Sequence, residues 1–392
     1  MGPGPTNTPA AVSLAAPALA AVERALAELR RGGIVVLRAE DGAGGLVIAA
    51  EACSTPGLQR LQGLAQEAPV LVTTRRRAEA IGMEIPPHIT GGMGDTNKPI
   101  TLDLPEGVPV DIILRPHEVE SAGRHVALRH LSRPVASHAP VIAETAIELA
   151  KLARLLPAVV LGPLSADPGN KRREWARDQD LIYVDAADVL DYEESAARNL
   201  QQVAQARVPL EGAENTRILA WRPSDGGKEH LAIVVGEINP IEPVLIRLHS
   251  ECFTGDLLGS LRCDCGVQLR SAIVEIAKHG SGVLLYLAQE GRGIGLVNKL
   301  RAYELQDDGF DTIDANEQLG FDADERIYAP AATMLLRMGI KRVRLMTNNP
   351  EKISGLTRHG VDVADRVAHS FPANGHNENY LRTKAERAGH LL

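Results

Sequence analysis

The sequence predicts a two-domain protein of the mixed α/β (α+β) class. Its 392 residues exceed what one ordinary domain holds, and its 44% hydrophobic and 23% charged residues are ordinary values for a folded chain. Segments with strand-like and helix-like apolar spacing alternate along most of its length. The 36 glycines and 24 prolines supply many turns between these segments. We therefore expect two α/β domains rather than a coiled coil or a disordered chain.

The charge balance and the aromatic content exclude several functional classes. The 42 basic and 50 acidic residues give a net charge of −8, which argues against a general binder of nucleic acid or membrane surfaces but allows a local basic pocket. Aromatic residues make up 3% of the chain, too few for a base-stacking platform. No apolar run approaches the roughly 18 residues of a membrane span, and the alanine-rich start lacks the basic segment of a signal peptide. We expect a cytoplasmic protein that binds neither nucleic acid nor membranes.

The first half of the chain alternates between expected helices and strands. Apolar residues at helical spacing predict a helix over 19–29, which two glycines end. A buried strand at 34–37 is followed by an expected loop at 38–45 and further elements at 46–50, 58–64, 70–73 and 78–81. A helix is expected at 141–156 and a strand at 159–161. The polar segment 191–215 predicts a boundary near residue 207, so the expected domains are 1–207 and 208–392.

The second half opens with strand-like segments. Those at 218–221 and 231–235 flank Asp225-Gly226-Gly227, a strong hairpin signal. A third strand is expected at 244–248, a helix that ends at Gly280, and a strand at 283–287. A glycine-rich loop, a helix at 296–305 and a late strand at 340–347 complete the pattern.

Three of the four cysteines crowd into one short segment. Cys53 stands alone and is expected to be a small buried apolar residue. Cys252, Cys263 and Cys265 offer three soft thiolates, a ligand type that favours zinc. Only three ligands are local, so a fourth position stays open for water, whose pKa an open zinc site lowers to about 7. The alternatives are a structural site closed by His249 or another residue, and three unliganded thiols.

The glycine-rich loop 289–295 lies between an expected strand and an expected helix. Its backbone N–H groups are candidates for a phosphate cradle, although it has neither the lysine of a Walker loop nor complete GxGxxG spacing. Arg292 would add a phosphate clamp, and Glu290 an acceptor for a base edge. A tight turn without a ligand is the alternative. The charged run 324–326 and Lys352 are, taken alone, typical of a solvated surface.

Taken together, these residues resemble the motifs of GTP cyclohydrolase II, in that family's order and spacing over about 207–392. The motifs are 249–256 (HSECFTGD), 260–266 (SLRCDCG), 289–295 (QEGRGIG), 311–316 (DTIDAN) and 347–350 (TNNP).

The resemblance implies roles for individual residues. Cys252, Cys263 and Cys265 correspond to the zinc ligands, and Tyr303 to an active-site position. Asp324 corresponds to the proposed proton acceptor and Arg326 to the proposed nucleophile toward the α-phosphate. A guanidinium stays protonated in proteins, so Arg326 is better suited to stabilising phosphoryl charge than to attacking phosphorus. The positions that hold GTP correspond to Arg247, Leu248, His249, Ser250, Glu251, Gln268, Glu290, Gly291, Arg292, Thr312, Thr347 and Lys352.

The N-terminal half resembles, more faintly, 3,4-dihydroxy-2-butanone 4-phosphate synthase, the usual fusion partner in bifunctional riboflavin enzymes. That family holds Mg²⁺ and a sugar phosphate with an acidic loop, which is here the shorter, carboxylate-poor segment 38–45 (RAEDGAGG). Its Gly-His-Thr-Glu motif appears as 141–144 (VIAE), with Ile142 in place of the histidine. Isoleucine neither coordinates Mg²⁺ nor transfers a proton. We expect a domain that keeps the fold and has lost the chemistry.

The function that the resemblance implies is zinc-dependent hydrolysis of GTP, with Mg²⁺ on its phosphates and a homodimeric enzyme. The products would be formate, diphosphate and 2,5-diamino-6-(5-phosphoribosylamino)pyrimidin-4(3H)-one, in the first step of riboflavin biosynthesis. One alternative is a paralogue acting in another pathway, such as pyrimidine catabolism. The other is a non-catalytic nucleotide-binding protein with a structural zinc.

Overall fold

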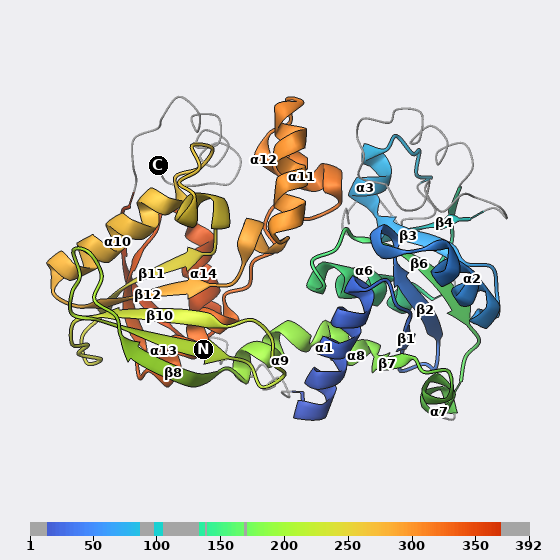
Figure 1. Cartoon of the computed structure of the whole chain (residues 1–392), viewed down its shortest axis with the longest axis horizontal. Coiled ribbons are helices and arrows are strands. Elements are labelled where there is room, and N and C mark those ends of the chain that lie inside the picture. The colour runs from blue at the N-terminus through green and yellow to red at the C-terminus, as the bar shows by residue number, and fades with distance from the viewer. Residues whose placement is uncertain (1–13, 87–97, 105–132, 138, 168–170, 370–392) are drawn as a thin grey trace, which may run out of the picture.

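The computed structural model in Figure 1 describes residues 14–86, 98–104, 133–137, 139–167 and 171–369. Two seven-stranded sheets lie side by side, each covered by helices (Figure 1). The expected mixed α/β class with two separate sheets is confirmed. None of the helices in these ranges is both long enough and apolar enough to cross a bilayer.

The first sheet has the strand order β5-β4-β3-β6-β2-β1-β7. Its pairs are antiparallel except β1 with β7, which is parallel. The loop expected at 38–45 is shorter, because Arg38 pairs with Gly44 and both belong to strands. The strands are β1 (Val35–Arg38), β2 (Gly44–Ala49), β3 (Val70–Thr74), β4 (Pro99–Asp103), β5 (Pro134–Val135), β6 (Ala158–Leu164) and β7 (Ile182–Asp185).

Helices cover both faces of this sheet. The expected first helix is α1 (Ala16–Arg30), whose apolar stripe is buried against one face together with α6 (Pro140–Leu152). The opposite face is covered by α2 (Thr55–Leu64), α3 (Arg75–Ala80) and α7 (Lys171–Asp178), in a cluster that includes the buried Cys53, as expected. The other helices in the described part of this half are η1 (Ala50–Ala52), α8 (Ala186–Leu190) and α9 (Tyr192–Arg198).

The second sheet has the strand order β14-β13-β11-β12-β10-β9-β8. The expected hairpin is present, since β9 and β10 pair antiparallel on either side of Asp225-Gly226-Gly227. Four strands, β12, β11, β13 and β14, form a parallel block. The strands are β8 (Gln201–Arg207), β9 (Thr216–Arg222), β10 (His230–Val235), β11 (Val244–Ser250), β12 (Gly282–Leu287), β13 (Arg342–Met346) and β14 (Asp362–Val367).

The parallel block is covered on one face by α10 (Cys265–His279) and on the other by α13 (Ala329–Arg337) and α14 (Pro350–Arg358). Buried aliphatic side chains on these helices and on the strands form the two apolar layers, because parallel strands are apolar on both faces. Two short helices, η2 (Phe253–Leu257) and η3 (Glu290–Gly293), lie in the loops that follow β11 and β12.

The segment 191–215, expected to be a polar boundary, contains a helix and a strand. β8 pairs with β9, so the residues immediately before position 207 belong to the second sheet. The seven side chains of β8 are all exposed, which explains why the sequence pattern there resembles a linker.

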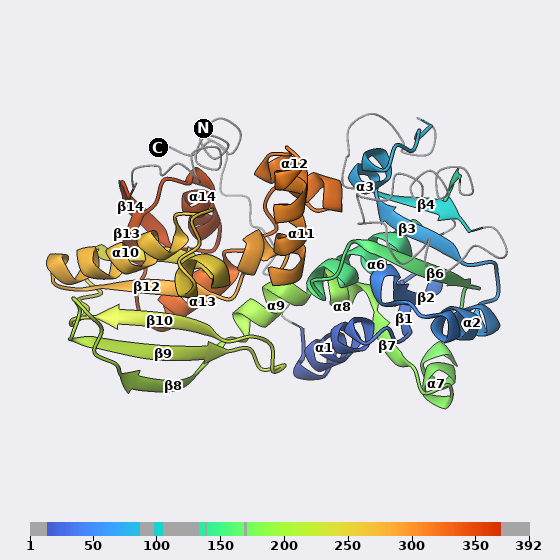
Figure 2. The same cartoon turned by 45° about the horizontal axis from the view of Figure 1, so that its top comes forward.

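Two helices, α11 (Leu296–Asp307) and α12 (Thr312–Leu319), lie between the two sheets (Figures 1 and 2). Leu156 of the N-terminal half joins Ile294, Leu305 and Phe321 of the C-terminal half in one buried cluster. Arg77 donates a hydrogen bond of 2.6 Å to the carbonyl of Gln318. The halves are therefore joined by an apolar core as well as by polar contacts.

Candidate active site

A pocket opens where the carboxyl ends of β11, β12 and β13 meet. β11 lies between the other two, so the chain leaves β11 toward β12 on one side and later returns to β13 on the other. In open parallel sheets, ligands bind where the strand order reverses in this way, because the loops after adjacent strands diverge there. The three loops contribute Glu251 and Cys252, Glu290 to Arg292, and Thr347 to Asn349 to the pocket wall.

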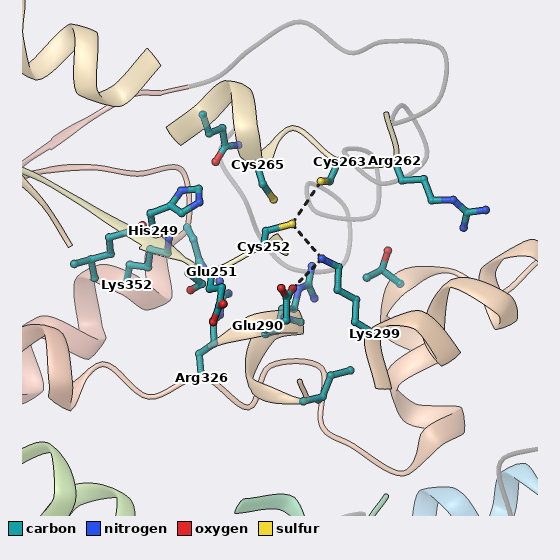
Figure 3. Close-up of a pocket in the computed structure, with 18 of the residues that line it drawn as sticks. His249, Glu251, Cys252, Arg262, Cys263, Cys265, Glu290, Lys299, Arg326 and Lys352 are labelled. Atoms are coloured by element: carbon teal, nitrogen blue, oxygen red, sulfur yellow. Dashed lines mark hydrogen bonds and ion pairs between the residues drawn. The ribbon is translucent and has the colours of Figure 1, made fainter. Parts of the chain in front are cut away.

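The three clustered cysteines converge beside this pocket (Figure 3). Cys252 follows β11, whereas Cys263 and Cys265 lie at the start of α10. Their sulfur atoms all lie within 4.8 Å of one another, and the Cys252 and Cys263 sulfurs are 3.7 Å apart. Two thiolates on a tetrahedral zinc, each at about 2.3 Å, lie about 3.8 Å from each other. The spacing of the sulfurs therefore fits a shared zinc ion.

Gly255 makes this convergence sterically possible. A Cβ atom at that position would lie 2.7 Å from the Cys263 sulfur and 3.0 Å from the Cys252 sulfur. Real Cβ atoms do not approach sulfur that closely, so any larger residue would push the cysteines apart. The short helix η2 folds the chain around this glycine, between the first cysteine and the other two.

Asp256 holds the segment that carries the first cysteine. Its carboxylate lies 3.0 Å from His249 Nε2 and accepts hydrogen bonds of 3.0 Å from the Tyr286 hydroxyl and from the Cys252 backbone N–H. The His249 ring also stacks on Tyr286. Burial lowers the pKa of His249 although Asp256 opposes this shift, so the imidazole is neutral at pH 7. The end of β11 is thus fixed by one buried carboxylate.

Lys299 on α11 provides a positive charge next to the cysteines. Its ammonium group lies 3.1 Å from the Cys252 sulfur and 2.9 Å from Glu290 Oε1 (Figure 3). It also lies 3.0 Å from the Thr254 hydroxyl. Hydrogen bonds from the thiols of Cys263 and Cys265, together with Lys299, lower the pKa of Cys252. The site therefore favours a thiolate at Cys252, which is the form that binds metal.

The glycine-rich loop adopts a tight left-handed turn. Gly291 and Arg292 have φ angles of +64° and +61°, and the second of these is unusual for a residue with a side chain. The N–H groups of Gly293 and Gly295 donate to backbone carbonyls of the same loop. Most of the amides proposed for a phosphate cradle are therefore already engaged, and the loop presents side chains to the pocket instead.

Glu290 ties this loop to the cysteine segment. Its carboxylate accepts hydrogen bonds from the N–H groups of Phe253 (2.6 Å) and Gly291 (3.0 Å), and it pairs with Lys299. Its expected role as an acceptor for a base edge stays a prediction, since all three of these donors are intramolecular.

Arg326 reaches the pocket from the loop after α12. Its guanidinium forms a two-point ion pair with Asp324, in which Nε lies 2.7 Å from Oδ1. Burial would raise the pKa of Asp324, but the charge and hydrogen bonds of Arg326 lower it overall. Asp324 is therefore ionised and orients Arg326. Asp324 itself is outside the set of pocket-lining residues, in contrast to the other residues singled out in the sequence.

The pocket is rich in positive charge although the chain as a whole is acidic. Burial lowers the pKa of Arg247 to about 10, so this guanidinium is still charged at neutral pH. Arg247 Nε has no hydrogen-bond partner in the described part of the chain, and Lys352 donates to the carbonyl of Leu248 at 2.7 Å. The lining includes two carboxylates, Glu251 and Glu290, and six cationic side chains, those of Arg247, Arg262, Arg292, Lys299, Arg326 and Lys352. Such a lining suits a polyanionic ligand.

The structure brings nearly all sequence-selected residues to this one pocket. Its wall contains the three cysteines, Tyr303, Arg326 and the whole expected GTP-binding set, namely Arg247, Leu248, His249, Ser250, Glu251, Gln268, Glu290, Gly291, Arg292, Thr312, Thr347 and Lys352. Tyr303 lies under two cations, with the guanidinium of Arg262 at 5.0 Å and the ammonium of Lys299 at 5.7 Å from its ring centre.

Several site residues were not singled out from the sequence. Asp256 and Arg262 lie inside motifs that the sequence revealed, so only their roles were missed. Lys299 had a weaker signal, since it precedes Tyr303 by four residues and therefore shares its helix face. The Asn348 side chain donates a hydrogen bond of 2.9 Å to the carbonyl of His369. These two residues lie far apart in the sequence, so no local pattern predicts this contact.

The fold and the site define an α/β protein whose pocket combines a cluster of three cysteines that could hold a metal ion with a lining rich in positive charge. The family model of GTP cyclohydrolase II matches residues 201–368. A GTP cyclohydrolase-2 from Azospirillum brasilense is 54% identical over 381 residues, which cover 96% of this chain and 94% of the relative. The chain belongs to the GTP cyclohydrolase II family and is an enzyme of that class.

Similarity extends through the N-terminal half. The riboflavin biosynthesis protein RibBA of Synechocystis is 37% identical over 95% of this chain and 71% of its own length. The RibBA of Salinispora arenicola is 37% identical over 95% of this chain and 94% of its own length. A solved two-domain 3,4-dihydroxy-2-butanone 4-phosphate synthase from A. baumannii aligns over 90% of this chain with 16% identity and a TM-score of 0.36, too weak a likeness for any conclusion. The two-part resemblance, a C-terminal cyclohydrolase domain and a synthase-like N-terminal domain, is confirmed.

Asp256→Asn should destabilise the protein by about 1–3 kcal/mol, because an amide replaces one acceptor and leaves buried donors of His249, Tyr286 or Cys252 unsatisfied. Urea unfolding measures this change in free energy. The control is Asp362→Asn on β14, whose side chain is 65% exposed and which should change stability by less than about 0.5 kcal/mol. Equal stability of the two variants would contradict the role given to Asp256.

Proposed function

We propose that the protein hydrolyses GTP to 2,5-diamino-6-(5-phosphoribosylamino)pyrimidin-4(3H)-one, formate and diphosphate, in a zinc-dependent first step of riboflavin biosynthesis. The observation that carries the proposal is one pocket that combines three converging thiols with six cationic side chains. The thiols supply a metal site for opening the base, and the cations supply binding for a triphosphate. Mass spectrometry of the products formed from GTP tests the proposal as a whole.

Zinc is the metal that the donor set fits best. Three thiolates are soft ligands, and zinc accepts them at a tetrahedral spacing that matches the 3.7 Å between Cys252 and Cys263. When bound, zinc supplies Lewis acidity for hydrolytic opening of the imidazole ring, from which C8 leaves as formate. Lys299 helps to keep Cys252 deprotonated for this purpose. Among the described residues three protein ligands converge, which is the composition of an open rather than a closed metal centre.

The triphosphate is proposed to lie along the cationic side of the pocket. Arg292 and Arg326 come from two different loops and line the same wall. Mg²⁺ is proposed to accompany the phosphates, since it prefers oxygen ligands and usually binds substrate phosphates. Arg326, oriented by Asp324, would stabilise the charge that develops when diphosphate leaves. Ionised and paired with Arg326, Asp324 is better suited to holding this arginine than to accepting a proton.

We divide the chain at about residue 200 in this proposal rather than at 207, because β8 pairs within the second sheet. The N-terminal domain is proposed to be inactive as a synthase. Ile142 is fully buried in the core, and the 38–45 turn is filled by Arg172, which donates to the carbonyl of Gly42 at 2.9 Å. Among the described residues, the cysteine cluster is the only group of three metal-ligating side chains within 4.8 Å.

A homodimer is proposed as the working assembly. Leu257, Leu258 and Leu261 near the cysteine segment are 70%, 65% and 59% exposed, and such apolar side chains are commonly covered by a partner subunit. Complementation of a riboflavin auxotroph that lacks cyclohydrolase II distinguishes this function from that of a paralogue acting in another pathway. A purely nucleotide-binding protein would bind GTP without releasing formate.

Cys263→Ser should abolish both metal binding and formate release, because serine is a poor ligand for zinc. Zinc content by atomic emission should fall from one ion per chain to nearly none. Cys53→Ala, which changes a buried cysteine of the other half, should retain the ion. Full formate release by a zinc-free sample would overturn the zinc assignment.

Arg326→Ala should lower kcat by about 10²-fold or more while GTP affinity changes much less, because the guanidinium acts on charge that develops in the transition state. Diphosphate release and GTP binding are measured separately. Arg342→Ala, at an exposed position of β13, serves as the control. Normal turnover with weakened GTP affinity would show that Arg326 is only a ground-state clamp.

The N-terminal domain should form no 3,4-dihydroxy-2-butanone 4-phosphate from ribulose 5-phosphate. Loss of a proton-transfer residue alone typically costs about 10²–10⁴-fold, and several of the Mg²⁺-binding carboxylates are also missing. The full-length protein is assayed with Mg²⁺ at high enzyme concentration, next to an active synthase. Turnover sufficient for riboflavin synthesis would mean that other residues have rebuilt the site.

A further inference from the structure

The end of helix α6, in the N-terminal half, contacts both loops that carry active-site arginines. Lys151 Nζ lies 2.8 Å from Glu325 Oε1 and 3.4 Å from Asp322 Oδ2. Arg154 donates a 2.6 Å hydrogen bond to the carbonyl of Ala288, immediately before the glycine-rich loop, and its own carbonyl accepts one of 3.1 Å from Asn298. One short stretch of the other domain thus contacts the segments that carry the pocket-lining Arg292 and Arg326.

Glu325 connects Lys151 to the loops of the active site. Its Oε1 accepts a 2.8 Å hydrogen bond from the Asp322 N–H, which closes the 322–326 loop, and Glu325 directly precedes Arg326. Its backbone N–H donates to the Arg292 carbonyl at 3.0 Å, and Arg292 NH1 donates to the Ala323 carbonyl at 3.1 Å. The two loops therefore form one hydrogen-bonded unit, with Lys151 attached to its centre.

Lys151 is also surrounded by acidic groups. Glu148 lies on the same helix. Burial and neighbouring carboxylates raise the pKa of Glu148 and of Glu193, although the charge of Lys151 opposes the shift at Glu148. Asp322, in the C-terminal half, also pairs with a second cation, because Arg76 NH2 lies 3.5 Å from its Oδ1. The side chain of Lys151 is 16% exposed, so its charge is only partly screened by water. Removing this ammonium would leave Glu325 facing other carboxylates.

We propose that Lys151 is a positioning residue for the cyclohydrolase reaction, which holds Arg292 and Arg326 in place through Glu325. The inference rests on the proposed function. It gives the N-terminal domain a present role, since the helix on which Ile142 replaces a catalytic histidine now supports the active site of the other domain. Lys151 does not line the pocket and acts through the 322–326 loop.

The first test compares Lys151→Met, which keeps the length and the apolar stem, with Lys151→Arg, which keeps the charge. Lys151→Met should lower kcat/KM by up to about 10²-fold, as expected when reacting groups are displaced by about 1 Å. The loss should fall mainly on kcat, because Arg326 is used in the transition state. Lys151→Arg should recover most of the activity. The matched control is Lys171→Met on α7, which is exposed and lies far from the second sheet (Figure 1).

A double-mutant cycle separates positioning from general destabilisation. Glu325→Gln alone should lower kcat in a similar way, and the double variant with Lys151→Met should lose little more than the more impaired single variant, because both changes break the same contact. If the losses of kcat in the two single variants instead multiply in the double variant, the proposal is overturned. Wild-type kcat and KM in folded Lys151→Met, or equal impairment of the Met and Arg variants, would also overturn it.

Hydrogen exchange provides a readout that does not depend on turnover. Amides of Gly295 and Glu325, both engaged in loop hydrogen bonds, should exchange faster in Lys151→Met than in wild type or Lys171→Met. Unchanged exchange would contradict the proposal. If wild-type protein releases no formate from GTP, the proposed function fails, whereas unaltered exchange and kinetics in an active enzyme defeat the positioning role alone.

Discussion

The reversal of strand order around β11 is the constraint on which the site depends. Parallel pairing of β11 with both β12 and β13 places three carboxyl ends at one edge of the sheet. The loops that follow must diverge there, and the pocket forms between them. Each loop brings a different chemical group: thiols after β11, a glycine-rich turn after β12 and amides after β13. These groups meet because the three strands are parallel neighbours whose carboxyl ends lie at the same edge of the sheet.

Buried hydrogen bonds and ion pairs fix the positions of the loops around this pocket. Asp256 fixes the end of β11, Glu290 links the glycine-rich loop to the cysteine segment, and Asp324 orients Arg326. Asp256 and Glu290 each accept hydrogen bonds from donors on separate segments, whereas Asp324 accepts those of Arg326, two residues along the chain. Buried polar groups are costly when unpaired, so such networks favour one arrangement of the loops over others. Arg247, Arg292 and Lys352 also line the pocket, which concentrates positive charge in a chain of net charge −8.

The two halves are coupled by more than a linker. Leu156 enters an apolar cluster with α11 and α12, and Glu51 forms an ion pair of 2.7 Å with Arg301. Helices α11 and α12 carry Tyr303 and Thr312, so contacts with the N-terminal half bear directly on the pocket wall. Ile142, which stands where the synthase family has a histidine, is buried in the core, in keeping with the proposal that this domain no longer acts as a synthase. Its packing surface against the other domain is the part of it that bears on the pocket.

The sequence by itself determined the local chemistry and most of the elements. Apolar periodicity predicted α1, the Asp225 turn predicted the β9–β10 hairpin, and the spacing of Cys252, Cys263 and Cys265 predicted a thiolate cluster. These features depend on residues close together in the chain, where period and turn chemistry act directly. The tertiary structure decided what distant segments do to one another. It placed exposed β8 in the second sheet, paired Glu325 with Lys151 and brought Lys299 to the Cys252 sulfur. Such contacts join residues from about ten to well over a hundred positions apart, and a lysine or glutamate has the same local pattern whether it meets water or a partner. Only the folded packing distinguishes the two.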